Sequence, residues 1–210
     1  MLGAASRVLV DLGTGDGRAV LERARREPDA LVIGIDASAA GMAESSLRAA
    51  RSPRKGGLPN ALFVVASAEA PPLELAGRAD ELTIAFPWGS LLRGALALEG
   101  AGDASCGIVR LVAPGATARI LVSVDPRDRL AIPPLDAGTR DDLEDRWRLL
   151  GGEVVEWRPA TDADIRATGS TWGRRLRAGR DRSVWRLEIR GRRDGESTRG
   201  TVLAPPATIR

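Results

Sequence analysis

Short apolar runs alternate with amphipathic stretches along the first 125 residues of the sequence. The apolar runs have the length and spacing of buried strands, and the stretches between them have the three-to-four-residue period of helices. The predicted strands are Arg7–Leu12, Leu31–Asp36, Ala61–Ala66, Glu81–Phe86 and Ala116–Val124. The predicted helices are Arg18–Arg26, Ala39–Arg51, Ser90–Leu98 and Ala104–Val112. This alternation predicts an α/β fold with a mainly parallel, doubly wound sheet.

The remainder of the chain completes this sheet. Val112–Ala116 contains a Pro-Gly pair and predicts a turn between helix and strand. A Pro- and Asp-rich loop is followed by a helix, a strand, a short helix and a final strand, predicted at Pro126–Thr139, Arg140–Leu150, Glu153–Ala160, Asp162–Ala167 and Arg182–Arg192. We therefore expect one seven-stranded domain over residues 1–193. The polar residues 194–210 are expected to be a disordered tail.

Composition narrows the class of protein. The 210 residues suffice for one domain with a sizeable core, and 43% hydrophobic with 28% charged residues is ordinary for a globular protein. No apolar run approaches the roughly 20 residues of a membrane span, and no signal peptide precedes the first strand. Cys106 is the single cysteine and histidine is absent, so neither an internal disulfide nor a metal site is expected. A cytoplasmic protein is the default expectation.

Positive charge is concentrated near the carboxyl end of the chain. Residues 170–193 contain nine arginines and two acids, a charge of +7, whereas the whole chain carries +3. The rest of the chain is therefore at about −4. Such a segment favours a polyanionic partner, although a solvated basic face explains it equally well when it is taken alone.

A glycine-rich loop follows the first predicted strand. In "DLGTGDG", Asp11, Gly13, Gly15 and Gly17 occupy alternate positions. A dinucleotide loop requires G-x-G-x-x-G, which would place the third glycine at Arg18, and no Walker A lysine motif occurs. S-adenosylmethionine has no pyrophosphate, but its amino-acid end needs close approach of the backbone, and glycine permits that approach. The loop therefore favours this cofactor.

Two further segments fit the same ligand. Asp36 ends the second predicted strand, where an acid can accept hydrogen bonds from both ribose hydroxyls. Ala68 and Glu69 follow the third strand, where an adenine ring would be flanked. An ordinary acid at a strand end would explain Asp36 alone, but not together with the glycine loop. We predict an S-adenosylmethionine-binding domain.

An aromatic pair follows the fourth predicted strand, at the sheet edge where ligands of open α/β sheets bind. DNA amino-methyltransferases have a polar residue at the position of Phe86, and that residue binds the exocyclic amine. Phe86 cannot do so, but Pro87 and Trp88 leave a ring suited to stacking on a flat base. The alternative is that Trp88 is an ordinary core tryptophan.

The available side chains restrict the chemistry of methyl transfer. The sequence has no histidine or tyrosine to act as a base, and Cys106 lies within a predicted helix, away from the fourth strand. A ring nitrogen with its own lone pair needs neither group, because positioning and electrostatics suffice for an in-line attack. Adenine N1 fits this description.

A second tryptophan lies in the basic segment. Trp172 has few apolar neighbours in sequence, so a loop with Ser170 and Trp172 could close over the second face of a flipped base. Flanking phosphates would be held by the arginines Arg174, Arg175, Arg177, Arg180 and Arg182. Another basic run without an acid contains Arg48, Arg51, Arg54 and Lys55.

At these residues the sequence resembles the kanamycin–apramycin resistance family of 16S rRNA adenine-1408 N1-methyltransferases. The matching motifs, in the family's order, are "DLGTGDG", "RKGGLPN", "FPWGSLLRG" and "STWGRRL…GRDR". The resemblance extends from Arg7 to about Leu187. It implies methylation of N1 of adenine 1408, in helix 44 of the assembled 30S subunit, by a monomer.

The resemblance also implies roles for individual residues. Trp88 and Trp172 would sandwich the flipped adenine, beside Pro87, and Ser170 would order the loop and the cofactor. S-adenosylmethionine would be held by Asp11, Gly13, Gly15, Gly17, Asp36, Ala68, Glu69, Phe86 and Trp88. The rRNA would be contacted by Arg48, Arg51, Lys55, Arg175, Arg180 and Arg182.

Two departures from the family pattern concern ribosome binding rather than cofactor binding. The sequence enters its first strand at Arg7, without the hairpin that precedes this strand in the family, and the segment around Asp125–Thr139 is expected to be shortened. Two other functions fit the cofactor motifs alone. One is methylation of a small aromatic molecule, and the other is cofactor binding without turnover.

Overall fold

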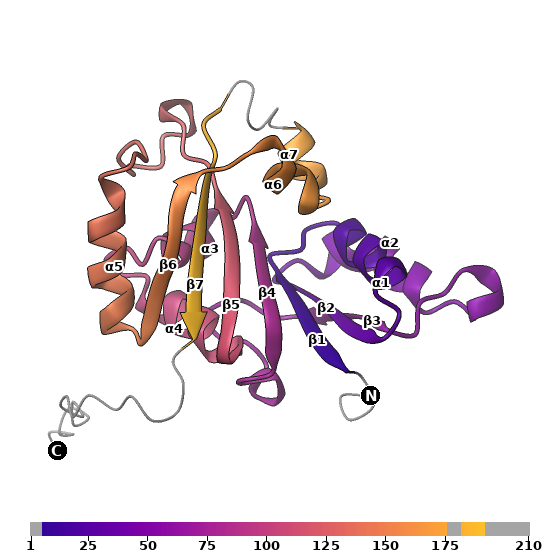
Figure 1. The fold of residues 1–210 in the computed structure, drawn as a ribbon. Helices are drawn as coiled ribbons and strands as arrows, with labels where there is room; N and C mark the ends of the chain where they lie inside the picture. Colours follow the sequence, from indigo (N-terminus) through magenta and orange to yellow (C-terminus); the bar gives the residue numbers. More distant parts are fainter. Residues whose placement is uncertain (1–5, 176–181, 192–210) are drawn as a thin grey trace, which may run out of the picture.

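The computed structural model describes residues 6–175 and 182–191, which build one seven-stranded sheet of order β3-β2-β1-β4-β5-β7-β6 (Figure 1). The strands are β1 (Arg7–Leu12), β2 (Ala30–Asp36), β3 (Ala61–Val65), β4 (Ala79–Ala85), β5 (Val112–Val122), β6 (Gly152–Pro159) and β7 (Trp185–Gly191). The helices are α1 (Arg18–Arg26), α2 (Ala39–Ala49), α3 (Gly89–Ala95), α4 (Gly102–Leu111), α5 (Thr139–Leu149), α6 (Asp162–Ala167) and α7 (Thr171–Arg175). Single 3₁₀ turns occur at η1 (Pro53–Lys55), η2 (Leu73–Leu75) and η3 (Pro126–Asp128).

The topology confirms the predicted doubly wound sheet. Strands β1 to β5 pair in parallel, and β1 lies between β2 and β4. Strand β7 is antiparallel to both β5 and β6, so the sheet is mixed. None of the helices that the structure describes is long and apolar enough to span a membrane.

Alternate residues of the strands bury opposite faces of the sheet, as the period of two requires. Val8, Val10 and Leu12 of β1 join the larger core, which α3, α4 and α5 cover. Leu9 of β1 joins a smaller core with α1 and α2. The sheet is therefore covered by helices on both faces around β1, where the glycine loop begins.

Two sequence predictions about element boundaries are wrong. The turn predicted at Val112–Ala116 is part of β5, because a register shift against β4 and a left-handed Gly115 (φ 78°) absorb the Pro-Gly pair within the strand. The segment around Ser170, predicted as a loop, contains the short helix α7. The predicted tail over residues 194–210 lies outside the described residues.

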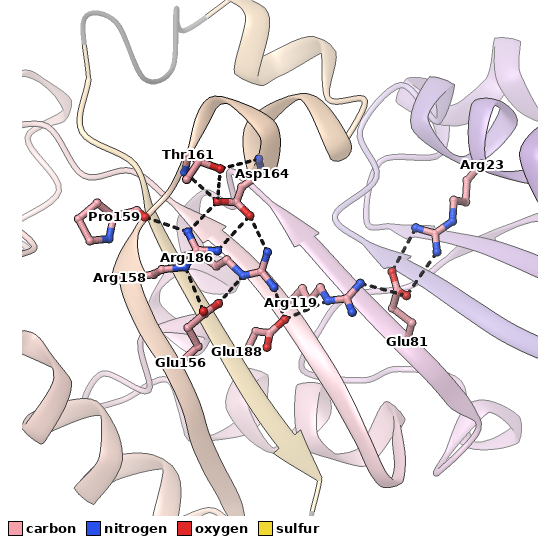
Figure 2. A network of polar contacts seen from close by, with 10 residues as sticks. All are labelled: Arg23, Glu81, Arg119, Glu156, Arg158, Pro159, Thr161, Asp164, Arg186 and Glu188. Carbon is pink, nitrogen blue, oxygen red and sulfur yellow. Dashed lines mark hydrogen bonds and ion pairs between the residues drawn. The ribbon is translucent and has the colours of Figure 1, made fainter.

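A network of ion pairs crosses the face of the sheet from α1 to α6 (Figure 2). At the end of the network nearest α6, Asp164 accepts hydrogen bonds from Arg158 of β6 at 2.7 Å and from Arg186 of β7 at 2.6 Å. Asp164 also closes a capping box with Thr161 at the start of α6. The network continues through Glu156, Glu188, Arg119, Glu81 and Arg23. It ties α6, and with it the chain that leads into α7, to the last two strands.

Asp164 is expected to contribute stability that depends on pH. Hydrogen bonds from Arg158 hold its pKa far below the usual range, so its contribution is present at neutral pH and is lost as pH falls below the unfolded-state pKa of about 4. Asp164→Asn should lower the free energy of unfolding by about 1–3 kcal/mol, because it weakens charged hydrogen bonds from two partly exposed arginines. Denaturant unfolding at pH 7 measures this loss.

Asp162→Asn is the matched control on the same helix. Asp162 makes only a long, exposed pair with Arg166, at 4.0 Å, so its loss should cost less than about 0.5 kcal/mol. Equal effects of the two substitutions would show that Asp164 does not anchor α6.

Candidate active site

A cavity of about 440 Å³ opens at the carboxyl ends of β1, β2 and β4, within the size range of small-molecule sites. It is the place where this topology puts a ligand, because the chain order reverses between β1 and β4. The predicted residues that line it are Asp11, Gly13, Gly15, Asp36, Ala68, Glu69, Phe86, Pro87, Trp88, Ser170 and Trp172. The structure therefore brings almost all the predicted cofactor and base contacts to one cavity.

The glycine loop joins β1 to α1 and requires left-handed backbone at alternate positions. Gly13 (φ 77°) donates its N–H to the Ile35 carbonyl at 2.7 Å, and a Cβ there would lie 2.5 Å from Leu91. Gly15 (φ 62°) donates to the Asp36 carboxylate at 2.8 Å. These hydrogen bonds to β2 fix the loop, and both of these glycines line the cavity.

Gly17 has a different role from the one predicted. It begins α1 with φ 70°, and a Cβ there would collide with Phe63 and lie 2.9 Å from the Cβ of Ser45. It is not among the residues that line the cavity. Gly17 allows α1 and α2 to pack closely against β3, and we remove it from the proposed cofactor contacts.

Asp36 is oriented by two backbone donors. Its carboxylate accepts from the N–H of Gly15 and from the N–H of Ser38, each at 2.8 Å. An ionised carboxylate has about four acceptor positions, so lone pairs remain for two vicinal hydroxyls. This geometry fits the ribose contact predicted for Asp36.

The cavity is strongly acidic. Four of its lining residues are acids, namely Asp11, Asp16, Asp36 and Glu69, and none of its described lining residues is a lysine or arginine. A hydrogen bond from the Ser90 hydroxyl lowers the pKa of Glu69, which keeps that carboxylate charged. Burial raises the pKa of Asp11 to about 6, and the neighbouring charge of Asp36 adds to this rise. The lining therefore suits a cationic ligand and disfavours a pyrophosphate.

The two tryptophans stand at this cavity with exposed rings. Trp88 is 39% exposed and Trp172 is 41% exposed, so the alternative that they are core residues is wrong. Their ring centroids lie 6.3 Å apart at an interplanar angle of 84°, an edge-to-face contact. The predicted sandwich of a flipped adenine between the two rings stays a prediction. Stacking both faces of a flat base requires one indole ring to rotate.

The residue before this pair is held in an unfavourable conformation. Phe86 has φ 55°, which is rare for a bulky side chain, and its ring is 4% exposed. Strain of this kind persists only where the surroundings fix it, and it occurs most often at functional sites. It turns the chain sharply at the end of β4, so that Pro87 and Trp88 enter the cavity wall.

Several lining residues were not predicted. These are Thr14, Asp16, Ala19, Ala37, Ser67, Ser90, Leu91, Thr168 and Thr171, together with the backbone neighbours Leu12, Ala66 and Ala85. Asp16 lies inside the glycine motif, so its position could have been inferred from the spacing. Thr168 and Thr171 reach the cavity only because the chain between β6 and β7 folds back over it, and no local pattern indicates that path.

The predicted rRNA contacts fall into three groups. Arg51 and Lys55 are exposed near η1, beside Arg48, which pairs with Glu44 at 2.6 Å. The Arg175 side chain and Arg180 lie outside the described part of the chain. Arg182 is not a freely exposed cation. Its side chain is 8% exposed and forms an ion pair with Asp128.

A doubly wound sheet with an antiparallel seventh strand, a glycine loop after β1 and an acid after β2 define a Rossmann-like S-adenosylmethionine-dependent methyltransferase. The acidic cavity suits this ligand, which carries a sulfonium and an ammonium group. Residues 1–190 match the family model NpmA, described as 16S rRNA (adenine(1408)-N(1))-methyltransferase. The chain belongs to this family.

Individual relatives agree with the family assignment. The chain is 34% identical over 183 residues to the 16S rRNA (adenine(1408)-N(1))-methyltransferase of Streptoalloteichus tenebrarius, which covers 83% of this chain and 82% of that protein. A crystal structure of a substituted form of the enzyme from Catenulisporales acidiphilia, with cosubstrate SAM, aligns with a TM-score of 0.83 at 33% identity, over 94% of this chain and 91% of that one. The 16S rRNA methyltransferase KamB aligns with a TM-score of 0.79 at 32% identity, over 90% of each chain.

The raised pKa of Asp11 predicts that cofactor affinity depends on pH. Burial raises this pKa to about 6, so if Asp11 pairs with the ammonium group of the cofactor as expected, protons compete with the ligand below that pH. We expect S-adenosylmethionine to bind about tenfold more weakly at pH 5 than at pH 7. Calorimetry across this range measures the effect, and no histidine titrates in the same window.

Asp11→Asn is the control for this titration. The substituted protein should bind more weakly at pH 7 and show a nearly flat profile between pH 5 and pH 7. An unchanged slope in Asp11→Asn would assign the titration to another group.

Proposed function

We propose that this protein transfers a methyl group from S-adenosylmethionine to N1 of adenine 1408 in the 16S rRNA of assembled 30S subunits, which gives aminoglycoside resistance. One observation carries the proposal beyond family membership: two exposed tryptophans stand together at the mouth of an acidic cofactor cavity. The proposal includes action as a cytoplasmic monomer on helix 44 of the subunit.

The residues of the cavity fit the cofactor. Asp36 would hold the ribose hydroxyls, Glu69 and Ala68 the adenine edge, and Asp11 the ammonium group, with the backbone of Gly13 and Gly15 beneath. When bound, S-adenosylmethionine supplies an electrophilic methyl group. The protein's own residues Phe86 and Trp88 would lie beside this methyl group and shield it from bulk water.

Adenine N1 suits a site that has neither histidine nor tyrosine to act as a base. Its lone pair can attack without prior removal of a proton, so the side chains need only orient the ring and exclude water. The indole rings of Trp88 and Trp172 can do this by stacking, after one ring turns from its edge-to-face position. The nearby carboxylates favour the positive charge that the methylated ring acquires.

The tryptophans should act on turnover rather than on subunit binding. Trp88→Ala and Trp172→Ala should each lose about 1–3 kcal/mol of base stacking. We expect near-normal 30S binding, poor methylation and loss of resistance, with partial activity in the Phe variants. Primer extension on rRNA measures the product directly, because N1-methyladenine blocks base pairing and stops the polymerase at position 1408.

Thermal melts separate stacking from folding in these variants. A buried tryptophan replaced by alanine costs about 3–5 kcal/mol, whereas these exposed rings should cost far less. Activity lost in proportion to unfolding would contradict the stacking role. Normal activity on a small aromatic substrate, with none on 30S subunits, would favour a small-molecule methyltransferase.

Exposed cations outside the cavity would bind the rRNA backbone. Arg51 and Lys55 lie on a compact turn after α2, and none of the described residues forms an ion pair with either of them. Arg175 and Arg180 follow Trp172 in the sequence. The guanidinium of Arg182 is oriented by hydrogen bonds to Asp128 and to the Ser123 hydroxyl. A phosphate could contact Arg182 only by approaching it beside Asp128.

The basic residues should act through electrostatics. Arg51→Glu and Arg180→Glu should weaken 30S binding while leaving cofactor affinity intact, and each lost phosphate contact should reduce the log–log salt slope by up to about 0.9, the duplex-DNA value. Filter binding over a salt series measures both quantities.

Arg78→Glu is the matched charge reversal. Arg78 is exposed and directly precedes β4, at the opposite edge of the sheet from the cavity. Equal losses for Arg51→Glu and Arg78→Glu would indicate a general charge effect and remove Arg51 from the interface.

A further inference from the structure

The segment between α6 and β7 that carries Trp172 returns to the cofactor cavity from the far end of the chain. We call residues 168–173 the cap segment. Figure 1 shows that α6 and α7 lie at the edge of the sheet where β4 and β5 end. Four residues of the cap segment, Thr168, Ser170, Thr171 and Trp172, line the cavity. The position of Trp172 therefore depends on what holds this segment against the rest of the protein.

Two glycines of the cap segment allow close approach to other elements. Gly169 (φ 63°) faces α1, where a Cβ would lie 3.1 Å from Glu22 Oε2. Gly173 faces the end of β4, where a Cβ would lie 2.5 Å from the ring of Phe86. These contacts fix the distance of the segment from α1 and β4, but neither supplies a directional bond.

The directional bond comes from the residue next to Trp172. Thr171 Oγ1 donates a hydrogen bond to Asp16 Oδ2 at 2.9 Å, across 155 positions of sequence. Asp16 is itself fixed, because its other carboxylate oxygen accepts from the Arg18 N–H at 3.1 Å and its carbonyl accepts from the Ser45 hydroxyl. A charged acceptor held in this way makes a strong hydrogen bond.

Helix α7 cannot hold Trp172 by itself. The part of it that the structure describes, Thr171–Arg175, is far shorter than an isolated helix needs to be for stability in water. Ser170 caps its first turn by accepting the Gly173 N–H at 3.2 Å, which is a bond within the cap segment. Orientation relative to the cavity must come from bonds to other elements, and among the described residues the Asp16–Thr171 bond reaches the cofactor loop.

We propose that Asp16 and Thr171 are a positioning pair, which fixes Trp172 relative to the glycine loop and so sets the substrate base in line with the cofactor methyl group. The inference rests on the proposed function, in which Trp172 stacks on the adenine. Neither residue exchanges a proton or touches the base. Because Asp16 lies in the cofactor loop, cofactor binding and Trp172 placement are coupled, and this coupling is reciprocal.

Thr171→Val tests the pair, because valine keeps the shape of threonine and removes the donor. Under single-turnover conditions with saturating 30S subunits and S-adenosylmethionine, we expect methylation to slow roughly tenfold, as the loss of a hydrogen bond to a charged group would cause. Subunit affinity should not change. Thr171→Ser keeps the O–H group and should restore most of the rate.

A double-substitution cycle shows whether the two residues act through each other. In an Asp16→Ala background, Thr171→Val should add little further loss, because the bond is already absent. Additive losses would overturn the pairing. A low rate in both Thr171→Val and Thr171→Ser, with a lowered melting midpoint, would also overturn it, because packing rather than the hydroxyl would then be responsible.

Trp172→Ala separates failure of this inference from failure of the proposed function. If Thr171→Val methylates at the parent rate while Trp172→Ala does not, the positioning pair is wrong and the stacking role stands. If Trp172→Ala itself methylates normally, the stacking role fails and the positioning pair fails with it.

Discussion

The parallel pairing of β1 with both β2 and β4 is the constraint on which the site depends. Because these three neighbours run in the same direction, the chain leaves each of them at one edge of the sheet. The glycine loop, Asp36 and the Phe86–Trp88 turn are thereby brought around a single cavity, although 75 positions separate Asp11 from Phe86. The left-handed glycines and the strained Phe86 are local consequences of turning the chain sharply at that edge.

Charge is separated between the cavity and its surroundings. Four acids line the cavity, whereas none of its described lining residues is a cation, and the exposed Arg51 and Lys55 lie outside it near η1. This division suits a cationic cofactor and a polyanionic substrate in one protein.

The last two strands supply the second wall of the site. The antiparallel β7 brings the chain back beside β5, and the segment that connects β6 to β7 crosses the open side of the cavity. Asp164 holds the first part of that segment on Arg158 and Arg186 (Figure 2). Further along the segment, Thr171 donates a hydrogen bond to Asp16. Stability of the sheet and placement of Trp172 are therefore linked through one stretch of chain.

The sequence alone determined the features that short-range patterns encode. Strand and helix periods predicted the sheet, α6 was predicted with its observed bounds, and glycine and acid spacing identified Asp11, Gly13, Gly15 and Asp36 as cavity residues. These succeed because backbone conformation at a turn and burial along a strand are set within a few residues. The motif after β4 placed Trp88 for the same reason.

Only the tertiary structure decided the features that depend on distant partners. Gly17 packs against Phe63 rather than lining the cavity, and Arg182 is buried against Asp128. The Pro-Gly pair before Ala116 stays within β5 because β4 offers a partner at a shifted register. The edge-to-face tryptophans and the bond from Thr171 to Asp16 join segments that only the folded chain brings together, so no local pattern could specify them.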